Sequence, residues 1–182
     1  SIMRLHGPAA AGLVFEGAIL IMISHAFVSS GLFAGVGFMY DRLHTRQISD
    51  LGGIVNVMPV FATFFLLFAM ANAGLPGTSG FVGEFMVILG AMKAGFWIAF
   101  WAATTLILGA AYTLWMVKRV IFGPILNAKV ATLKDLSKFE LSAYVLLAAM
   151  VLWMGVYPQT MLTYVHQAAG YTLMHADQSK IV

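Results

Sequence analysis

The stretch ANAGLPGTSGFVGEF, residues 71–85, interrupts an apolar run that extends from Ile54 to Met92. As one straight helix that run would be about 58 Å long, whereas the hydrocarbon core of a bilayer is about 30 Å thick. Pro76 removes a backbone donor and clashes with the preceding turn, so a helix ends or kinks there. The sequence therefore predicts a transmembrane helix that is broken near its middle.

The composition around this stretch requires a lipid solvent. Of 182 residues, 61% are hydrophobic and 9% are charged, whereas an ordinary soluble domain carries about 25% charged residues. A water-soluble domain of this size could not cover so much apolar surface. The ten Lys and Arg residues are scattered between apolar runs and form no basic face for nucleic acid. The lack of cysteine excludes disulfides, thiolate metal sites and thiol nucleophiles.

Besides the broken run over 54–92, three apolar segments are long enough to cross a bilayer, for which about 20 residues suffice: residues 17–40, 95–117 and 140–157. The sequence therefore predicts an all-α, polytopic transmembrane helix bundle over residues 17–158, preceded by an N-terminal loop over 1–16. Residues 159–182 alternate apolar and polar side chains and are predicted to form a tail at the membrane interface.

The basic residues predict how often the broken helix crosses. If it crosses once, seven Lys and Arg residues lie on one side and three on the other, whereas two crossings give four against six. The positive-inside rule favours the single crossing, with the polar segments 41–53 and 118–138 facing the cytoplasm or matrix. The seven are Arg42, Arg46, Lys118, Arg119, Lys129, Lys134 and Lys138.

Glycines on the first apolar segment indicate that neighbouring helices approach it closely. Gly31, Gly35 and Gly37 present no side chain, so the backbone of a neighbouring helix can approach them closely. We expect this chain to be unstable alone and to lie among many other helices.

Glu84 is an ionisable residue inside an apolar run, one turn beyond the break. A carboxylate ion is unfavourable at that depth, so the group can change between neutral and charged forms and can carry a proton. Backbone groups left unpaired at a break are tolerated only inside protein or beside water, so the break brings water near the carboxyl group. We interpret Glu84 as a proton-path residue. The alternative is a glutamate that pairs with a partner helix and fixes assembly.

His25 is the second ionisable residue in an apolar run, about 12 Å along the first crossing if that helix starts near Gly17. Ser29 follows at i+4 and shares its face. A neutral imidazole can accept a proton on one ring nitrogen and release one from the other, which suits a relay. A histidine that donates one structural hydrogen bond between helices is the alternative, and both interpretations stay open.

The other titratable residues are weaker candidates. Glu16 is interpreted as a solvated residue at the start of the first helix. His166 and His175 match no metal-ligand spacing, and no phosphate loop, nucleophile elbow or dinucleotide fingerprint is present in the sequence. A loop cap is expected from Asp41, Arg42, His44 and Arg46. Its ion pairs would lie at the surface, where each contributes little to stability.

The sequence resembles one family of membrane subunits from about Gly17 to Pro158. The family is the antiporter-like chain M of bacterial respiratory complex I, called ND4 in mitochondria. Sister subunits usually carry lysine in the position of Glu84, so glutamate favours chain M. The strings that carry the resemblance are SHAFVSSGLFAGVGFMYDRLHTRQISDLGGIVNVMP, ANAGLPGTSGFVGEFMVILGAMK, YTLWMVKRVIFG and VLWMGVYP.

The resemblance implies a subunit with two inverted helical repeats, of which this chain holds the second part. It implies that His25 belongs to a central polar axis and that Glu84 is the terminal proton-exit residue. It also implies a role in coupling NADH–quinone electron transfer to proton translocation. No cofactor is expected in this chain; NAD, FMN, iron–sulfur clusters and quinone are expected in partner subunits.

The expected partners are the remainder of the same subunit, other membrane subunits of complex I, and the lipid bilayer. The sequence begins at Ser1 rather than Met, as expected of a processed chain, one part of a split subunit or an incomplete sequence. A split mitochondrial subunit is the favoured interpretation. It places the chain in the mitochondrial inner membrane, and a bacterial plasma membrane is the alternative.

Two other functions remain open at this point. Cation/proton antiporters and membrane-bound hydrogenases share the fold, so the chain could be a subunit of either. A structural membrane spacer that has lost the proton path is the other alternative. The string HTRQI, together with GFVGEF, favours complex I, and the presence of Glu84, His25 and the break in one chain argues against a spacer.

Overall fold

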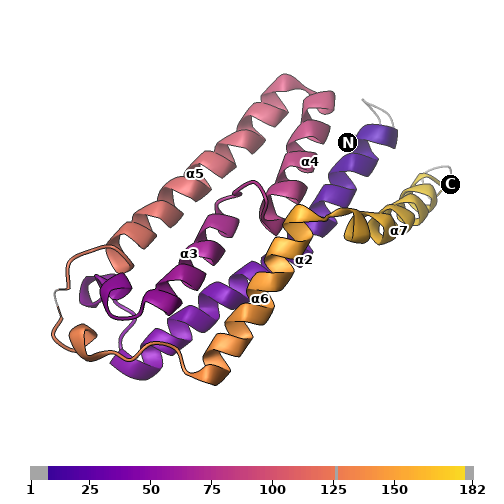
Figure 1. Cartoon of the computed structure of the whole chain (residues 1–182). Helices are drawn as coiled ribbons and strands as arrows, with labels where there is room; N and C mark the ends of the chain where they lie inside the picture. The colour runs from indigo at the N-terminus through magenta and orange to yellow at the C-terminus, as the bar shows by residue number, and fades with distance from the viewer. Residues whose placement is uncertain (1–7, 126, 179–182) are drawn as a thin grey trace.

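The computed structural model describes residues 8–125 and 127–178, and every regular element in these two ranges is a helix (Figure 1). This confirms the predicted all-α fold. The α-helices are α2 (Pro8–Leu43), α3 (Pro59–Asn72), α4 (Ser79–Ala94), α5 (Phe96–Val120), α6 (Lys138–Val156) and α7 (Gln159–Gln178). Three short 3-10 helices lie in the loops: η1 (Ile48–Asp50), η2 (Ile54–Asn56) and η3 (Val130–Thr132).

Three of the helices are long and apolar enough to cross a membrane by themselves: Ala10–Leu43 of α2, Phe96–Val120 of α5 and Lys138–Val156 of α6. The predicted N-terminal loop over 1–16 is wrong from Pro8 onward, because α2 begins there. Proline suits the first turn of a helix, and the alanines that follow are strong helix formers. A helix also need not end where the hydrocarbon ends. Residues 1–7 lie outside the described residues.

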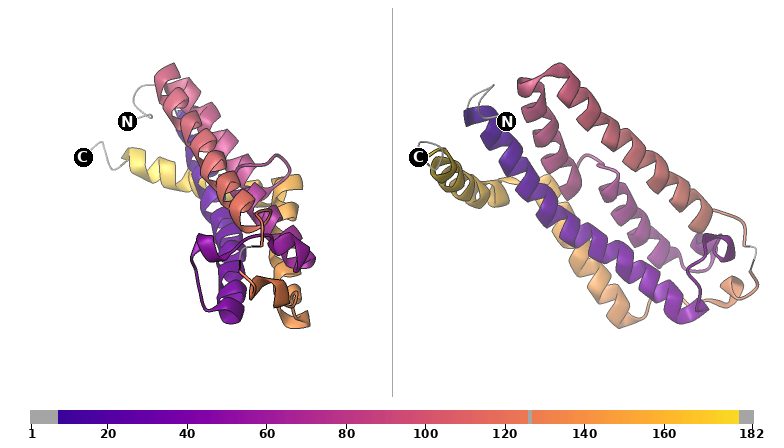
Figure 2. Two further views of the ribbon diagram at one scale, coloured as in Figure 1. Left: turned by 90° about the vertical axis from the view of Figure 1, so that its left-hand side faces the viewer. Right: turned by 180° about the vertical axis from the view of Figure 1, so that it is seen from behind.

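The predicted broken helix is confirmed. Helix α3 has 14 residues and α4 has 16, so each is too short to cross alone. Figures 1 and 2 show that α4 continues from the middle of the bundle in the direction of α3. The two helices are separated by residues 73–78, and we call this segment the break.

The two polar loops lie at the same end of the bundle (Figure 1). Residues 44–58, 121–125 and 127–137 form this loop end, and the tight turn between α4 and α5 lies at the opposite end with the start of α2. The arrangement fits a single crossing by the broken helix. All seven basic residues that were predicted to face the cytoplasm or matrix lie in or beside the loop end. Lys93 lies at the opposite end of the bundle, in the last turn of α4. Arg4 and Lys180 are outside the described residues.

Aromatic side chains fill the core beside α2, around the buried ring of Tyr144. Gly31 and Gly35 are closely approached here, but by aromatic rings rather than by the helix backbone that was predicted. A Cβ atom added to Gly31 would lie 2.7 Å from the Phe68 ring, and one added to Gly35 would meet the Tyr144 hydroxyl oxygen. The prediction for Gly37 is wrong, because no atom lies within 4 Å of such a Cβ. The rings whose centroids lie within 5.2–6.1 Å of the Tyr144 ring are Phe38, Phe61, Phe64 and Phe68.

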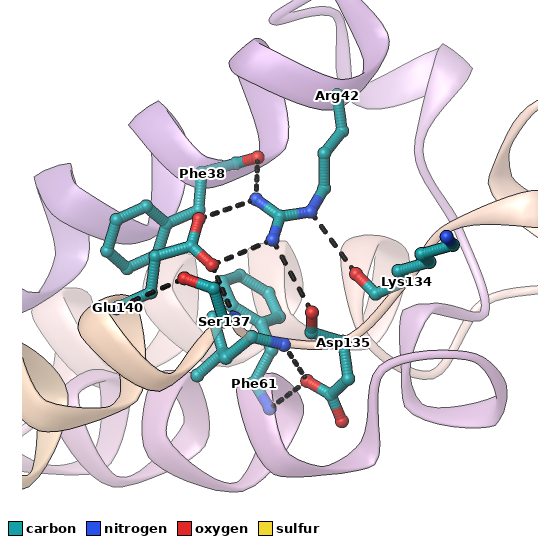
Figure 3. Close-up of polar contacts among 8 residues, drawn as sticks. Phe38, Arg42, Phe61, Lys134, Asp135, Ser137 and Glu140 are labelled. Carbon is teal, nitrogen blue, oxygen red and sulfur yellow. Dashed lines mark hydrogen bonds and ion pairs between the residues drawn. The ribbon is translucent and has the colours of Figure 1, made fainter.

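Arg42 joins α2 to α6 at the loop end (Figure 3). Its Nη1 and Nη2 atoms each donate to one carboxylate oxygen of Glu140, both at 2.8 Å. The guanidinium also donates to the backbone oxygen atoms of Phe38, Lys134 and Asp135. The expected loop cap of weak surface pairs is therefore wrong for Arg42. Sequence reasoning missed this because Glu140 is 98 residues away.

The carboxylates beside Arg42 hold helix starts. The Asp135 carboxylate accepts from the backbone nitrogens of Val60 at 2.8 Å and Phe61 at 3.1 Å, in the first turn of α3. Glu140 accepts from the Ser137 backbone nitrogen, and the Ser137 hydroxyl accepts from the Glu140 backbone nitrogen. This is a capping box at the start of α6. The loop end is thus fixed by charge-assisted hydrogen bonds that join three helices.

We predict that Gly35→Ala destabilises the protein in its native complex, whereas Gly37→Ala does not. The added methyl group at residue 35 would overlap Tyr144, and overpacking of a filled core typically lowers stability by about 1–3 kcal/mol. The two variants add the same group to the same helix two residues apart. Thermal denaturation of purified membranes would show a lower melting temperature for Gly35→Ala alone. Equal melting temperatures would contradict the packing described here.

The membrane orientation is tested by labelling, which the cysteine-free sequence makes simple. We expect a single cysteine at Ala131, in the loop end, to react with an impermeant maleimide only from the cytoplasmic or matrix side of sealed vesicles. A single cysteine at Lys93, at the opposite end, should react only from the other side. Reaction of Ala131→Cys from the outer side would refute the predicted orientation.

Candidate functional site

Hydrogen bonds attach both edges of the break to neighbouring helices. The Ser24 hydroxyl of α2 lies 2.7 Å from the Ser79 hydroxyl at the start of α4, and both residues are buried. The Asn72 amide nitrogen at the end of α3 donates to the Thr113 hydroxyl of α5 at 3.2 Å. Helices α2 and α5 therefore both pair polar groups with the edges of the break. Such pairing is what a polar segment needs at membrane depth.

A glycine of α6 covers a third side of the break. A Cβ atom added to Gly155 would meet the carbonyl oxygen of Gly77 and the backbone of Thr78. Within the break, the Leu75 carbonyl oxygen accepts from the Thr78 backbone nitrogen at 3.1 Å and from the Thr78 hydroxyl at 2.7 Å. Thr78 at the end of the break is thus buried against α6, whereas residues 75–77 at its centre are exposed on this chain.

Glu84 lies in the second turn of α4, with its carboxylate turned back toward the break. Its Oε2 atom is buried and has no hydrogen-bond partner among the described residues. A Cβ atom added to Gly74 would lie 2.6 Å from this oxygen, so the backbone of the break approaches the carboxylate closely. Gly74 has φ 78°, which glycine adopts without strain. A buried polar atom without a partner in a native protein requires an explanation.

The carboxylate faces a small cavity between α2, α3 and α4. Its volume is about 50 Å³, whereas a single water needs roughly 10–15 Å³ on the same scale. The cavity therefore has room for a few water molecules next to the unpaired oxygen. Its polar lining comes from Ser24, His25, Asn72 and Glu84.

A second cavity extends from this point toward the loop end. Its volume is about 400 Å³, its walls are mainly apolar, and it reaches Thr45 and Arg46. His25 and Asn72 line both cavities, so the two meet at these residues. Ser29 lines the larger cavity, as expected from its position on the His25 face of α2. The residues that line the two cavities extend from Thr45 and Arg46 at the loop end to Glu84.

The structure thus brings the two predicted site residues to one cavity. His25 is exposed at its rim and has no hydrogen bond or ion pair within the described part of the chain. The junction residues Asn72 and Thr113 were missed as site residues. A polar amide and a hydroxyl inside otherwise apolar helices were the available signal. That Asn72 and Thr113 meet could not be known, since 41 residues separate them.

The prediction for Glu16 is wrong. Because α2 begins at Pro8, Glu16 lies in the third turn, and its side chain is only 14% exposed. Its Oε1 atom lies 2.6 Å from the Nδ1 atom of His166, which is on α7. This contact joins α7 to the N-terminal part of α2, away from the loop end, and Figure 2 shows two views of how the two helices lie. The side chain of His175 lies outside the described residues.

Comparison with known proteins identifies the family. Residues 5–110 match the family described as "NADH:quinone oxidoreductase/Mrp antiporter, TM", which is more than half of the chain. The chain belongs to this family. Family membership, together with the three apolar helices, makes the chain an integral membrane protein.

Relatives in bacteria and plants are similar over most of this chain. Subunit M of NADH-quinone oxidoreductase from Rhodobacter capsulatus is 44% identical over 164 residues, which cover 89% of this chain and 32% of the relative. Chain 4 of NADH-ubiquinone oxidoreductase from Marchantia polymorpha is 44% identical over 160 residues, 88% of this chain and 32% of the relative. The chain therefore spans about a third of the length of these curated relatives.

Solved structures share the helix arrangement. A chain of respiratory complex I from Thermus thermophilus with bound NADH superposes with a TM-score of 0.83 at 29% identity, covering 95% of this chain and 36% of that one. A chain of the Mrp complex from Dietzia sp. DQ12-45-1b gives a TM-score of 0.75 at 21% identity, covering 85% of this chain and 37% of that one. The second likeness shows the fold alone. Together they confirm the predicted antiporter-like fold.

The contact between the break and Glu84 predicts different effects for two similar substitutions. Gly74→Ala and Gly77→Ala both place an alanine at positive φ, 78° and 90°, so they share the backbone strain. The added methyl group at residue 74 alone would meet Glu84 Oε2, because nothing lies within 4 Å at residue 77. The infrared carboxyl band of Glu84 can be identified because it disappears in Glu84→Gln. We expect this band to shift in Gly74→Ala and to keep its position in Gly77→Ala. A band unmoved in both variants would contradict this geometry.

Proposed function

We propose that this chain forms part of the proton path of an antiporter-like, proton-pumping membrane subunit of respiratory complex I. The observation that carries the proposal is the unpartnered carboxylate oxygen of Glu84, in a cavity that it shares with His25 beside a helix break. Intramembrane ionisable residues of this kind are associated with proton relays. The similarity to subunit M and chain 4 supports the assignment.

The geometry suits stepwise proton transfer. Protons enter from the loop end and reach the junction of the two cavities at His25 and Asn72. His25 accepts a proton on one ring nitrogen and releases one from the other. Asn72, fixed by Thr113, offers a polar surface that orders water at the junction. Glu84 then takes up the proton, which neutralises its charge, and passes it toward the opposite side.

The proposal requires partners. The chain spans about a third of its relatives, and His25 is exposed on its own, so the remainder of the same subunit covers this face in the working protein. Other complex I membrane subunits and the lipid bilayer complete the surroundings. Electron transfer, with NAD, FMN, iron–sulfur clusters and quinone, belongs to partner subunits. The relatives come from bacteria and from eukaryotes, and the mitochondrial inner membrane remains our proposed location.

A subunit of a cation/proton antiporter is the second candidate, supported by the structural likeness to the Mrp complex. The two functions differ in their coupling. In complex I, proton movement through Glu84 depends on electron transfer from NADH to quinone. In an antiporter, it depends on a counter-moving cation and continues without NADH.

The test is Glu84→Gln in the purified complex reconstituted into vesicles. Glutamine keeps nearly the same shape but cannot ionise, so proton pumping should fall by about tenfold or more. NADH–quinone turnover should fall with it because the two are coupled. Glu84→Asp should retain part of the activity, and His25→Ala should reduce pumping less, since water can bridge the gap it leaves.

Glu16→Gln is the matched control, because it removes a carboxylate of the same chain that lies outside the two cavities. It should leave protons pumped per electron unchanged. Normal assembly and wild-type pumping in Glu84→Gln would show that Glu84 is structural. Proton movement that requires Na⁺ or K⁺ and not NADH would support the antiporter instead.

A further inference from the structure

A third cavity borders the larger one, with which it shares the lining residues Ile48 and Leu51. It is at the loop end, between the last turn of α5 and the segment around η1, and its volume is about 220 Å³. Its charged and hydroxyl groups are Lys118, Arg119 and Ser49. In a membrane this is the level at which hydrocarbon gives way to head groups, because α5 ends here.

Close backbone packing fixes the shape of this cavity. A Cβ atom added to Gly52 would meet the carbonyl oxygen of Pro124, and one added to Gly123 would lie 2.6 Å from the carbonyl oxygen of Arg119. The Val55 backbone nitrogen donates to the Ile121 carbonyl oxygen at 3.2 Å. The loop before α3 is thus pressed against the end of α5. The cavity between them is preformed.

The positive charge in the cavity is uncompensated within the described part of the chain. Lys118 and Arg119 are both exposed and form no ion pair or side-chain hydrogen bond there. The nearby carboxylate of Asp50 instead accepts hydrogen bonds from the Thr45 and Ser49 hydroxyls. The Arg119 guanidinium lies 4.6 Å from the centroid of the Trp115 ring, and this contact holds the charge at the edge of an apolar surface.

An exposed apolar face leads away from these charges along α5. Leu108, Tyr112 and Trp115 are 66%, 64% and 58% exposed, and they precede Arg119 at helical spacing on the same face. Helix α5 is also the least buried of the three spans. In its apolar segment 11% is buried inside the protein, whereas the value is 28% for α2 and 22% for α6. A surface of this kind fits an acyl chain that runs along the helix.

We propose that this cavity binds the phosphate of an anionic glycerophospholipid, with one acyl chain along the exposed face of α5. Lys118 and Arg119 would contact the phosphate, the Ser49 hydroxyl would turn from Asp50 to donate to it, and Trp115 would pack beside the glycerol region. Basic pockets beside transmembrane helices on the cytoplasmic or matrix side suit such head groups. None of His25, Asn72 and Glu84 lines this cavity, so the proposal goes beyond the function proposed above.

The test uses the intact complex in nanodiscs of phosphatidylcholine with a small fraction of photoactivatable phosphatidylglycerol. After illumination and digestion, mass spectrometry should find the label on peptides from the second half of α5. Lys118→Gln with Arg119→Gln should reduce this labelling by about tenfold or more, since each basic residue near the surface adds to the attraction. Lys129→Gln with Lys134→Gln removes the same charge from the same end outside the cavity and should leave labelling unchanged.

Ser49→Asp provides a second variant that keeps both cations and places a negative charge in the cavity, and it should also reduce labelling. Unlabelled phosphatidylglycerol should compete, whereas added phosphatidylcholine and millimolar inorganic phosphate should not. Equal labelling of all variants, or equal labelling by a phosphatidylcholine probe, would overturn the proposal. No label on wild-type α5 would mean that protein covers this face. Competition by inorganic phosphate would assign the cavity to a soluble anion.

Discussion

The structure depends on one constraint, which is that an interrupted helix at membrane depth must not expose its polar backbone to lipid. Residues 73–78 place such an interruption between α3 and α4, and three helices meet it with three kinds of contact. Helix α2 supplies a buried hydroxyl pair, α5 supplies a hydroxyl to an amide, and α6 supplies a glycine against the backbone. The bundle is therefore organised around its least regular segment.

The same constraint places the chemistry. A break brings polar groups to a depth where an ordinary helix has none, and it leaves room beside it that side chains do not fill completely. Glu84 lies one turn beyond the break and faces that room, while His25 reaches it from α2. The carboxylate can be accommodated there because the break has already made the surroundings polar. The packing of the break and the ionisable side chains of Glu84 and His25 therefore occupy the same part of the fold.

Much of this architecture is predictable from the sequence. Hydrophobic length, Pro76 and the glycine-rich string 71–85 determine the number of crossings and the position of the break. Glu84 and His25 stand out because ionisable residues are rare in such runs. The pairs Arg42–Glu140, Asn72–Thr113 and Glu16–His166 are not predictable, because they join positions 98, 41 and 150 residues apart. Hydropathy reports burial in lipid and carries no information about which helices touch.

Helix α6 has a mechanical consequence that follows from its two ends. At its charged end Glu140 is bound to Arg42 of α2, and at its other end Gly155 rests directly on the backbone of Gly77 and Thr78. One continuous helix therefore joins the two contacts. We therefore expect a displacement of the loops around Arg42 to be transmitted along α6 to the break. Helix α6 thus connects the loop end, on one side of the membrane, with the break at its middle.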